Sequence, residues 1–586
     1  MRVARIIIVM GLALGLIVGL SPRPIAAPSA AGARQGPPLS QAALFSRAAL
    51  QTRQGVDVQG LEMETAARAA VAERTAAARG AAALSALAVP GPGRQANTDW
   101  NARFQNETSI VLRGSGWIIG ANDYGIGTPI GTGVYTDQGV NYFPPFPLLA
   151  ATGVFAPPFL LLEPPAGTGD PALATGFTRA GAGLPAGLPV WYMASIGFSQ
   201  TWCENGVFVY RSLDRGKNWT RPVVPLLAGG PLRTVVYQGD GVDCSVFHDK
   251  EWIAVDDTNG PRKGRVYVTW TKFLFTPDYV ESPIMLAYSD NNGDSWSAPI
   301  EVNGSSLAIC PNQVAGAAGE CDENQFSVPV VLPNGKVAIA FENEQGTNGG
   351  DPNFRDQYLV TIFNPATDTV AGPYKVADLF DGFEDYPFNS DGRQTVCNSN
   401  FRLNSAGNIA LDKNNGHLYV VWSDNRRHAG EFTPAPVFVG AFPYACPAGK
   451  KTDVDVFISR STNGGVTWSA PVRVNQDTFG NDKDQWFPWV AVAPNGRVDV
   501  VFYDRRGDAG NKLAHTFLAR SWNGGATWTD FAVSSFASNF DNAFPGGRFI
   551  GDYNGLAIRS DGKSFPVWTG VTPGKFDSDI FFEIVP

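Results

Sequence analysis

Charged residues recur in this sequence just before and just after short apolar runs. Asp424-Asn-Arg-Arg427 follows one such run, and Asp504-Arg-Arg506 follows another. Arginine is the side chain best suited to bidentate capture of a carboxylate. If the fold gathers these positions at one mouth, that mouth could recognise a sugar that carries a carboxylate. The candidate substrate-binding residues are Arg402, Arg427, Arg506 and Arg548.

The apolar runs themselves form a repeat. A glycine, a polar or basic residue and an apolar stretch ending in Trp or Phe recur at intervals of roughly 65 to 80 residues, which predicts a repeat fold. Most copies follow an apolar run and an Asn-Gly or Asp-Gly turn, the strongest short hairpin signal. Such units are typical of four-stranded propeller blades. The copies are Gly264–Trp270, Gly335–Phe341, Gly416–Trp422, Gly496–Phe502, Gly562–Trp568 and a degenerate Gly116–Asn122.

We therefore predict an all-β fold, a six-bladed β-propeller over residues 99–586. The expected blades are 104–222, 248–303, 324–377, 405–475, 485–536 and 549–586. The first blade would hold an insertion, 126–190, rich in Pro, Gly, Phe and Leu, which is either a lid or a surface elaboration. A strand near 108–112 should help to close the ring, and one near 580–585 should lie in the last blade.

In a propeller, the start of each first strand and the turn after each second strand meet on one face. Ligands bind there because several blades converge polar groups on one spot. Besides the arginines, this rule selects Asp249, Glu251, Glu342 and Tyr553.

A second motif, Ser-x-Asp-x-Gly-x-x-Trp, occurs four times and is known as the Asp-box. Asp or Asn caps its own turn, Gly takes the positive φ, and Trp fills the space beside the next strand. The motif is a structural device and says nothing by itself about activity. Its residues are Ser212, Asp214, Gly216 and Trp219, then Asn291 with Trp296, Asn463 with Trp468, and Asn523 with Trp528.

Repeated Asp-boxes in a propeller resemble the sialidase (neuraminidase) superfamily, and the resemblance covers about residues 100–586. It implies an exo-glycosidase that hydrolyses terminal sialic acid or a related acidic sugar by a retaining mechanism with a tyrosine nucleophile. Tyr553, in Asp552-Tyr-Asn-Gly-Leu556, falls in the matching place. The resemblance then makes Asp249 or Glu251 the acid/base, and Glu342 or Glu344 the group that polarises Tyr553.

The chain departs from the family at its first arginine. The family carries an arginine near the start of the propeller, where this chain reads Asn106-Glu-Thr-Ser-Ile110. The nearest similar phrase is Phe401-Arg402-Leu-Asn404, in the fourth unit. Two function classes therefore stay open: a glycoside hydrolase, and a non-catalytic propeller that binds glycan or protein at the cell surface.

The N-terminus has the order of a secretory signal: Arg2 and Arg5, an apolar run, then small residues. We expect a signal peptide over 1–31, an Ala-rich spacer over 32–98 that is partly helical or disordered, and a secreted or cell-surface protein. An uncleaved anchor is the alternative. Six cysteines fit export, and nearest-neighbour pairing predicts the disulfides 203–244, 310–321 and 397–446, with buried free thiols as the alternative.

Composition excludes some partners. A net charge of -9 shows no basic footprint, so we expect no nucleic-acid partner. None of the four histidines has the spacing of a zinc site. We expect a monomer that binds a glycan or glycoconjugate and needs no cofactor, with Ca²⁺ in the loops 256–259 or 381–385 as the alternative.

Overall fold

The computed structural model describes residues 94–96, 104–124, 131–136, 146–147, 165–181, 183–199, 205–219, 235–238, 245–275, 280–311, 319–344, 355–432 and 437–586. These residues belong to one compact unit, Pro38–Pro586. Within them, strands dominate and the helices are three short 3-10 turns, η1 (Arg426–His428), η2 (Phe540–Asn542) and η3 (Pro545–Gly547).

The described strands form seven antiparallel sheets, whose strands are named below from the innermost outwards. The first three are β2 (Gln105–Arg113), β3 (Gly116–Asp123), β4 (Gly131–Thr136) and β5 (Phe146–Pro147); β6 (Pro165–Phe177), β7 (Pro189–Ser199), β8 (Asn205–Ser212) and β9 (Val235–Gln238); β10 (Val246–Val255), β11 (Val266–Phe275), β13 (Ile284–Ser289) and β14 (Ile300–Glu301), with β12 (Val280–Glu281) beside β11.

The other four sheets follow in chain order. They are β15 (Asn324–Val331), β16 (Val337–Asn343), β17 (Gln357–Asn364) and β18 (Thr369–Asp378); β19 (Ile409–Leu411), β20 (Leu418–Asp424), β21 (Asp455–Ser461) and β22 (Val472–Arg473); β23 (Gln485–Val492), β24 (Val498–Asp504), β25 (His515–Ser521) and β26 (Thr529–Ala532); and β27 (Gly555–Ile558), β28 (Ser564–Gly570), β29 (Asp579–Phe582) and β1 (Arg94–Gln95).

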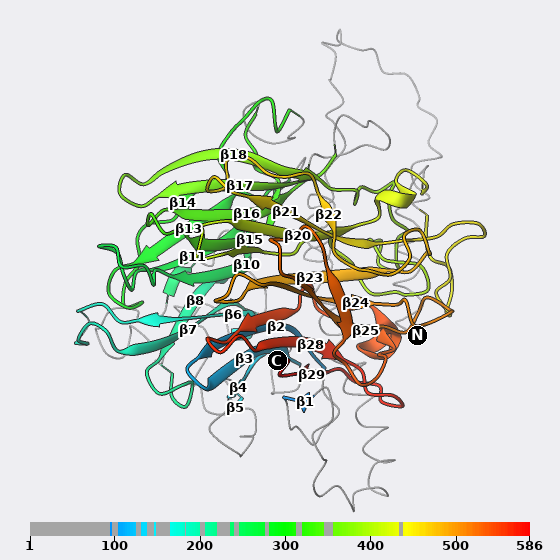
Figure 1. Cartoon of the computed structure of the whole chain (residues 1–586), viewed down its shortest axis with the longest axis horizontal. Coiled ribbons are helices and arrows are strands. Elements are labelled where there is room, and N and C mark those ends of the chain that lie inside the picture. The colour runs from blue at the N-terminus through cyan, green and yellow to red at the C-terminus, as the bar shows by residue number, and fades with distance from the viewer. Residues whose placement is uncertain are drawn as a thin grey trace, which may run out of the picture. The chain divides into compact units, whose positions relative to one another are not determined.

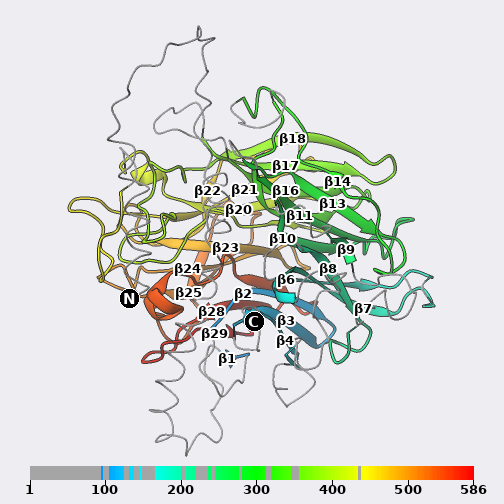
Figure 2. The same cartoon turned by 180° about the vertical axis from the view of Figure 1, so that it is seen from behind.

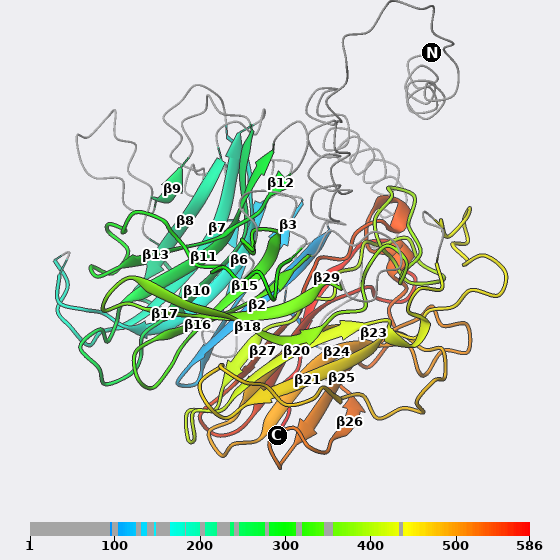
Figure 3. The same ribbon diagram turned by 90° about the horizontal axis from the view of Figure 1, so that it is seen from above.

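The innermost strands make a closed ring. Each of β2, β6, β10, β15, β19, β23 and β27 contacts the next, and β27 contacts β2. Figures 1 and 2 show the red strands β28 and β29 beside the blue strands β2 and β3. Seen from above, the orange sheet of β23–β26 lies beside the yellow sheet of β19–β22 (Figure 3). The fold is a seven-bladed β-propeller.

The prediction of six blades was wrong because residues 104–222 contain two sheets. The segment 126–190, expected as an insertion, supplies β4, β5, β6 and the start of β7. The inner strand β6 reads Pro-Ala-Gly-Thr-Gly-Asp-Pro-Ala-Leu-Ala-Thr-Gly-Phe and has none of the alternation of a half-buried strand. Neighbouring sheets cover it on both faces, so its small residues are tolerated: a Cβ on Gly176 would lie 2.4 Å from Val255 Cγ1.

The ring closes differently from our expectation. β2 covers the predicted strand near 108–112 but is the innermost strand of the first blade. The closing strand is β1, whose Arg94 and Gln95 pair with Phe582 and Phe581 of β29. The last residues of the predicted spacer, 32–98, therefore belong to the propeller, while the predicted signal peptide, 1–31, lies outside the described residues. The C-terminal strand lies in the last blade, as predicted.

The repeated phrase forms the second strand of six blades, and in five of them its final aromatic residue fills the core between sheets. Trp270, Trp422 and Trp568 are fully buried. The hairpin turn before each strand needs a left-handed glycine, and Gly335 and Gly496 have φ of +77° and +82°. The sheets are thus held face to face by rings that each bury about 150–250 Å².

The four Ser-x-Asp/Asn-x-Gly-x-x-Trp turns join the third and fourth strands of blades 2, 3, 5 and 6. In the first, the Gly216 N–H donates to Ser212 Oγ over 2.8 Å and the Asn218 N–H donates to Asp214 Oδ1 over 2.9 Å. Trp219 Nε1 donates to the Gly216 carbonyl over 3.1 Å. The turns at Ser461 and Ser521 make the same bonds, which fasten each turn to its own strand.

Two of the predicted disulfides are present, Cys310–Cys321 and Cys397–Cys446. Cys203 and Cys244 lie outside the described residues. No helix among the described residues is both long and apolar enough to cross a membrane.

Candidate functional site

Five of the seven inner strands carry the same irregularity. In β2, β6, β10, β15 and β23, two residues oppose one on the neighbouring strand. The first residue of each bulge is left-handed: Glu107, Asp170, Lys250, Phe326 and Phe487 have φ between 50° and 57°. Each such conformation costs about 1–3 kcal/mol, and bulges re-aim side chains beside functional sites. Five equivalent bulges are therefore a feature of the site and not isolated strain.

Three bulge residues converge at one point. Lys250 Nζ donates to Asp170 Oδ2 over 2.7 Å and lies 3.5 Å from Glu107 Oε1. It also lies 2.8 Å from Oδ2 of Asp552, from the last blade. Arg402 makes a bidentate pair with Asp552, at 2.9 Å and 2.5 Å. We call these five residues the axial acid cluster; four are buried, and the Arg402 side chain remains 28% exposed.

The carboxyl groups of the cluster have pKa values that are shifted in opposite directions. Burial alone would raise the pKa of Asp170, but the Lys250 ammonium and a hydrogen bond with Glu107 outweigh it and lower the pKa to about 2. Burial, with repulsion from Asp170, raises the pKa of Glu107 well above its usual range. Burial thus favours the protonated form of Glu107, whereas Lys250 favours the ionised form of Asp170.

Asp249 lies next to this cluster and is only partly buried. Its Oδ1 accepts a hydrogen bond from the Lys250 backbone N–H over 2.9 Å. Burial raises the pKa of Asp249 to about 6, and the Asp170 carboxylate adds repulsion. Asp249 can therefore hold and release a proton near neutral pH.

A second carboxyl pair lies at the end of β16. Glu342 shares a hydrogen bond with Asp381, and burial raises the pKa of Glu342 to about 8. Burial and the neighbouring Glu342 raise the pKa of Asp381 as well, so the pair retains a proton. Repulsion from Asp552 also acts on Glu342, which puts the pair within electrostatic reach of the axial acid cluster.

Tyr553 packs among aromatic rings. Its ring centroid lies 5.4 Å from Trp252 and 6.0 Å from Trp489, and the two tryptophans lie 4.7 Å apart. Tyr553 Oη makes no hydrogen bond within the described residues. Burial raises the pKa of Tyr553 well above its usual range. In this geometry neither Glu342 nor Glu251 is bonded to the phenol.

The structure does not bring the four candidate arginines together. Arg402 joins the axial acid cluster, whereas Arg548 Nη1 lies 3.2 Å from Asp391. Arg506 Nη2 lies 2.6 Å from Asp504 and from Asp530.

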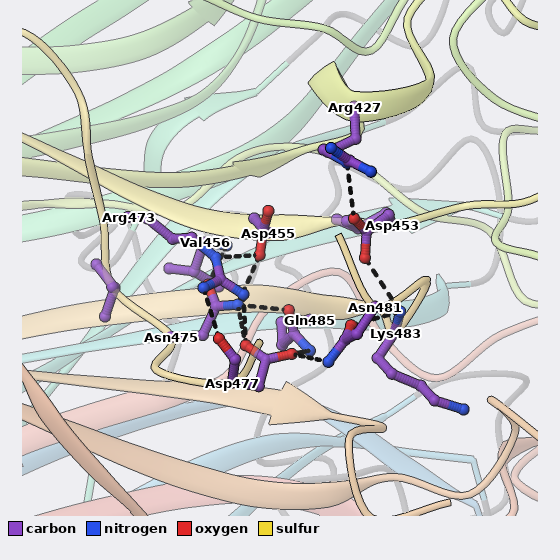
Figure 4. A network of polar contacts seen from close by, with 12 residues as sticks. Arg427, Asp453, Asp455, Val456, Arg473, Asn475, Asp477, Asn481, Lys483 and Gln485 are labelled. Atoms are coloured by element: carbon purple, nitrogen blue, oxygen red, sulfur yellow. Dashed lines mark hydrogen bonds and ion pairs between the residues drawn. The ribbon is translucent and has the colours of Figure 1, made fainter. Parts of the chain in front are cut away.

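Arg427 Nε lies 3.3 Å from Asp453, beside a network centred on Asp477 (Figure 4). In that network Asn475 and Asn481 each donate to Asp477 over 2.8 Å, and Gln485 donates to it over 3.1 Å. Each of the four candidate arginines is thus paired with an aspartate.

Other candidate ligands are likewise engaged. Asp256 Oδ1 accepts from the Thr258 N–H over 2.9 Å and caps a turn. His428, Asp453 and Asp482 bring ligand atoms within 4.8 Å of one another. However, Lys451 pairs with Asp482 and Arg427 pairs with Asp453. The carboxylates of Asp453 and Asp482 are thus already paired with basic side chains of the protein.

Sequence reasoning missed Glu107 and Asp170 as site residues. Glu107 stands in Gln-Asn-Glu-Thr-Ser, five consecutive polar residues that open a fully buried stretch of β2. Such a polar run at the start of an inner strand was the available signal. Asp170 lies in β6, the strand that the repeat pattern did not reveal.

Comparison with known proteins assigns no family. No family model and no curated protein match this chain. A protein of unknown function from Dyadobacter fermentans aligns with a TM-score of 0.38 and 10% identity over 85% of this chain and 99% of its own. A Hadza microbial sialidase aligns at 0.37 and 12% identity over 80% and 73%. An α-L-arabinofuranosidase of Fusarium graminearum, solved with arabinobiose, aligns at 0.35 and 12% identity over 70% and 92%.

Proposed function

We propose that this propeller is a carbohydrate-active enzyme that cleaves glycosidic bonds by acid–base chemistry at the axial acid cluster. The observation that carries the proposal is the convergence of Glu107, Asp170 and Asp552 on Lys250, with the partly exposed Asp249 beside them. Glycoside hydrolysis needs two carboxyl groups with different roles, one protonated and one ionised. This cluster supplies both states at neutral pH.

The roles follow from the environments. Asp249, with a pKa of about 6 and access to solvent, suits a general acid that protonates the leaving oxygen. Asp170, ionised above a pKa of about 2, suits the group that stabilises positive charge on the sugar or activates the nucleophile. Lys250 holds Asp170 and Asp552 in fixed positions.

The finer form of the proposal is an exo-sialidase in which Tyr553 attacks the sugar. That mechanism needs a carboxylate on the phenol and arginines free to bind the carboxylate of sialic acid. Tyr553 Oη makes no hydrogen bond within the described residues, and Arg402 is paired with Asp552. We therefore favour the carboxyl-based mechanism over the tyrosine nucleophile.

The test is release of a fluorophore from a panel of aryl glycosides by the purified protein. The panel includes an α-sialoside, common hexosides and an α-L-arabinofuranoside. We expect turnover of at least one member, a loss of at least about 100-fold in Asp249→Asn, and near wild-type rates in Tyr553→Phe. Turnover of the α-sialoside that disappears in Tyr553→Phe would instead establish the sialidase mechanism.

A non-catalytic propeller that binds glycan or protein is the second candidate. The observation that favours it is the complete pairing of the four arginines with aspartates, as in a structural ion network. Binding on a glycan array without fluorophore release from any glycoside of that sugar would support this reading.

A further inference from the structure

A small cavity lies on the axis of the propeller, next to the axial acid cluster. Its lining includes Glu251, Trp252, Ser327, Trp489 and Tyr553, together with Lys250 and Asp552 of the cluster. We call it the axial chamber. Glu251 and Ser327 are the second residues of the bulges in β10 and β15, so equivalent positions of two neighbouring blades face it.

Three polar groups in the chamber make no hydrogen bond to another described residue: the Glu251 carboxyl, Ser327 Oγ and Tyr553 Oη. Glu251 and Ser327 are each 1% exposed, and Tyr553 is 8% exposed. Buried polar groups in folded proteins are almost always hydrogen-bonded or hold water or an ion. Three such groups from three blades around one cavity indicate a ligand.

The nearby Lys250 ammonium makes no hydrogen bond with Glu251, and its charge only partly offsets the effect of burial there. Lys250 Nζ is held between Asp170 and Asp552, at 2.7 Å and 2.8 Å. Burial raises the pKa of Glu251 well above its usual range, and the Asp170 carboxylate adds repulsion. A positive ligand would relieve both effects, whereas an anion would increase the repulsion.

We infer that a hard metal cation binds in the axial chamber, held by the Glu251 carboxylate and the hydroxyl groups of Ser327 and Tyr553. The donor set contains oxygen and no nitrogen or sulfur, which selects Ca²⁺, Mg²⁺ or Na⁺ over transition metals. The cation joins the third, fourth and seventh blades at the axis. Its role is independent of any reaction at the axial acid cluster.

The test uses the purified protein, freed of metal with a chelator and transferred to tetramethylammonium chloride. Ca²⁺, Mg²⁺ and Na⁺ are then titrated separately at constant ionic strength, and binding is followed by calorimetry and by the Tm. We expect one cation to raise the Tm by at least about 2 °C at saturation. The three titrations distinguish which cation the chamber takes.

Glu251→Gln keeps the shape of the side chain and removes its charge, so the Kd should rise at least tenfold and the Tm response should disappear. Asp482→Asn, in the cluster with His428 and Asp453, is the matched control and should respond like the wild type. If Glu251→Gln does not fold, Ser327→Ala should still weaken binding. A Tm that no cation changes, or a response kept in Glu251→Gln and lost in Asp482→Asn, would overturn the inference.

Discussion

The Lys250 ammonium should be the main electrostatic support of the site, and Lys250→Met tests this. The substitution leaves the Asp170 carboxylate buried without its cation, whereas Asp552 keeps its pair with Arg402. Removing one partner of a buried ion pair costs about 3–5 kcal/mol because the remaining charge is uncompensated. We expect a loss of that size in the free energy of unfolding at pH 7.5, measured by guanidinium titration.

The pH dependence separates charge from packing. In the wild type, the pKa of Asp170 is lowered to about 2 from its ordinary 3.8, which corresponds to roughly 2 kcal/mol of stability. Because the folded pKa is lowered, this stability is present above about pH 4 and is lost as the pH falls towards 2. Without Lys250, burial raises the pKa of Asp170, so this carboxyl group takes up a proton on acidification and the variant recovers stability.

The difference between wild type and Lys250→Met should therefore shrink from pH 7.5 to pH 4.5. Lys413→Met is the control, since Lys413 is 71% exposed and its pair with Asp257 should contribute less than about 1 kcal/mol. A difference that stays constant between the two pH values would refute the electrostatic reasoning and leave lost packing as the cause.

Three further predictions concern the acid, the phenol and the closing strand. If Asp249 is the general acid, kcat/KM should fall as the pH rises above its pKa of about 6, and a profile without that limb in the wild type would exclude the role. In cation-free buffer, Tyr553→Phe removes an unbonded buried hydroxyl and should raise the free energy of unfolding by up to about 1 kcal/mol; a marked loss would reveal a missed partner. Deleting residues 94–96 removes β1 and should lower the Tm, as a thermal melt against the longer chain would show; an unchanged Tm would mean that the last blade is stable without β1.

The repeat pattern identified the propeller class because its phrase coincides with buried second strands, from β11 to β28. The blade number could not be read in this way, since β6 is rich in Gly, Ala and Pro and gains its apolar surroundings from neighbouring sheets. The local sequence pattern therefore fails to predict a strand whose two faces are both covered by neighbouring sheets.

The site was foreseen only in outline. Asp249 and Arg402 lie where strand ends were expected to converge, and the pairing of each arginine with a nearby aspartate depends on distances that sequence does not contain. Glu107 and Asp170 reach Lys250 because both lie in β-bulges with positive φ. The residue types at these positions do not predict such bulges. The convergence of these side chains depends on how the blades are arranged around the ring, and the sequence of a single repeat does not contain it.

The junction between the last blade and the first is the one seam where distant parts of the chain must meet. The Gln105 N–H donates to Ser578 Oγ across it, a contact between residues 473 positions apart. Glu107 and Asp552 come from opposite sides of this seam, and both depend on Lys250. A nascent chain that has not reached Asp552 therefore lacks one member of the cluster, so we expect the cluster to form only when the last blade packs against the first. Because contacts of such long range form slowly, completion of the site should coincide with the last step of folding.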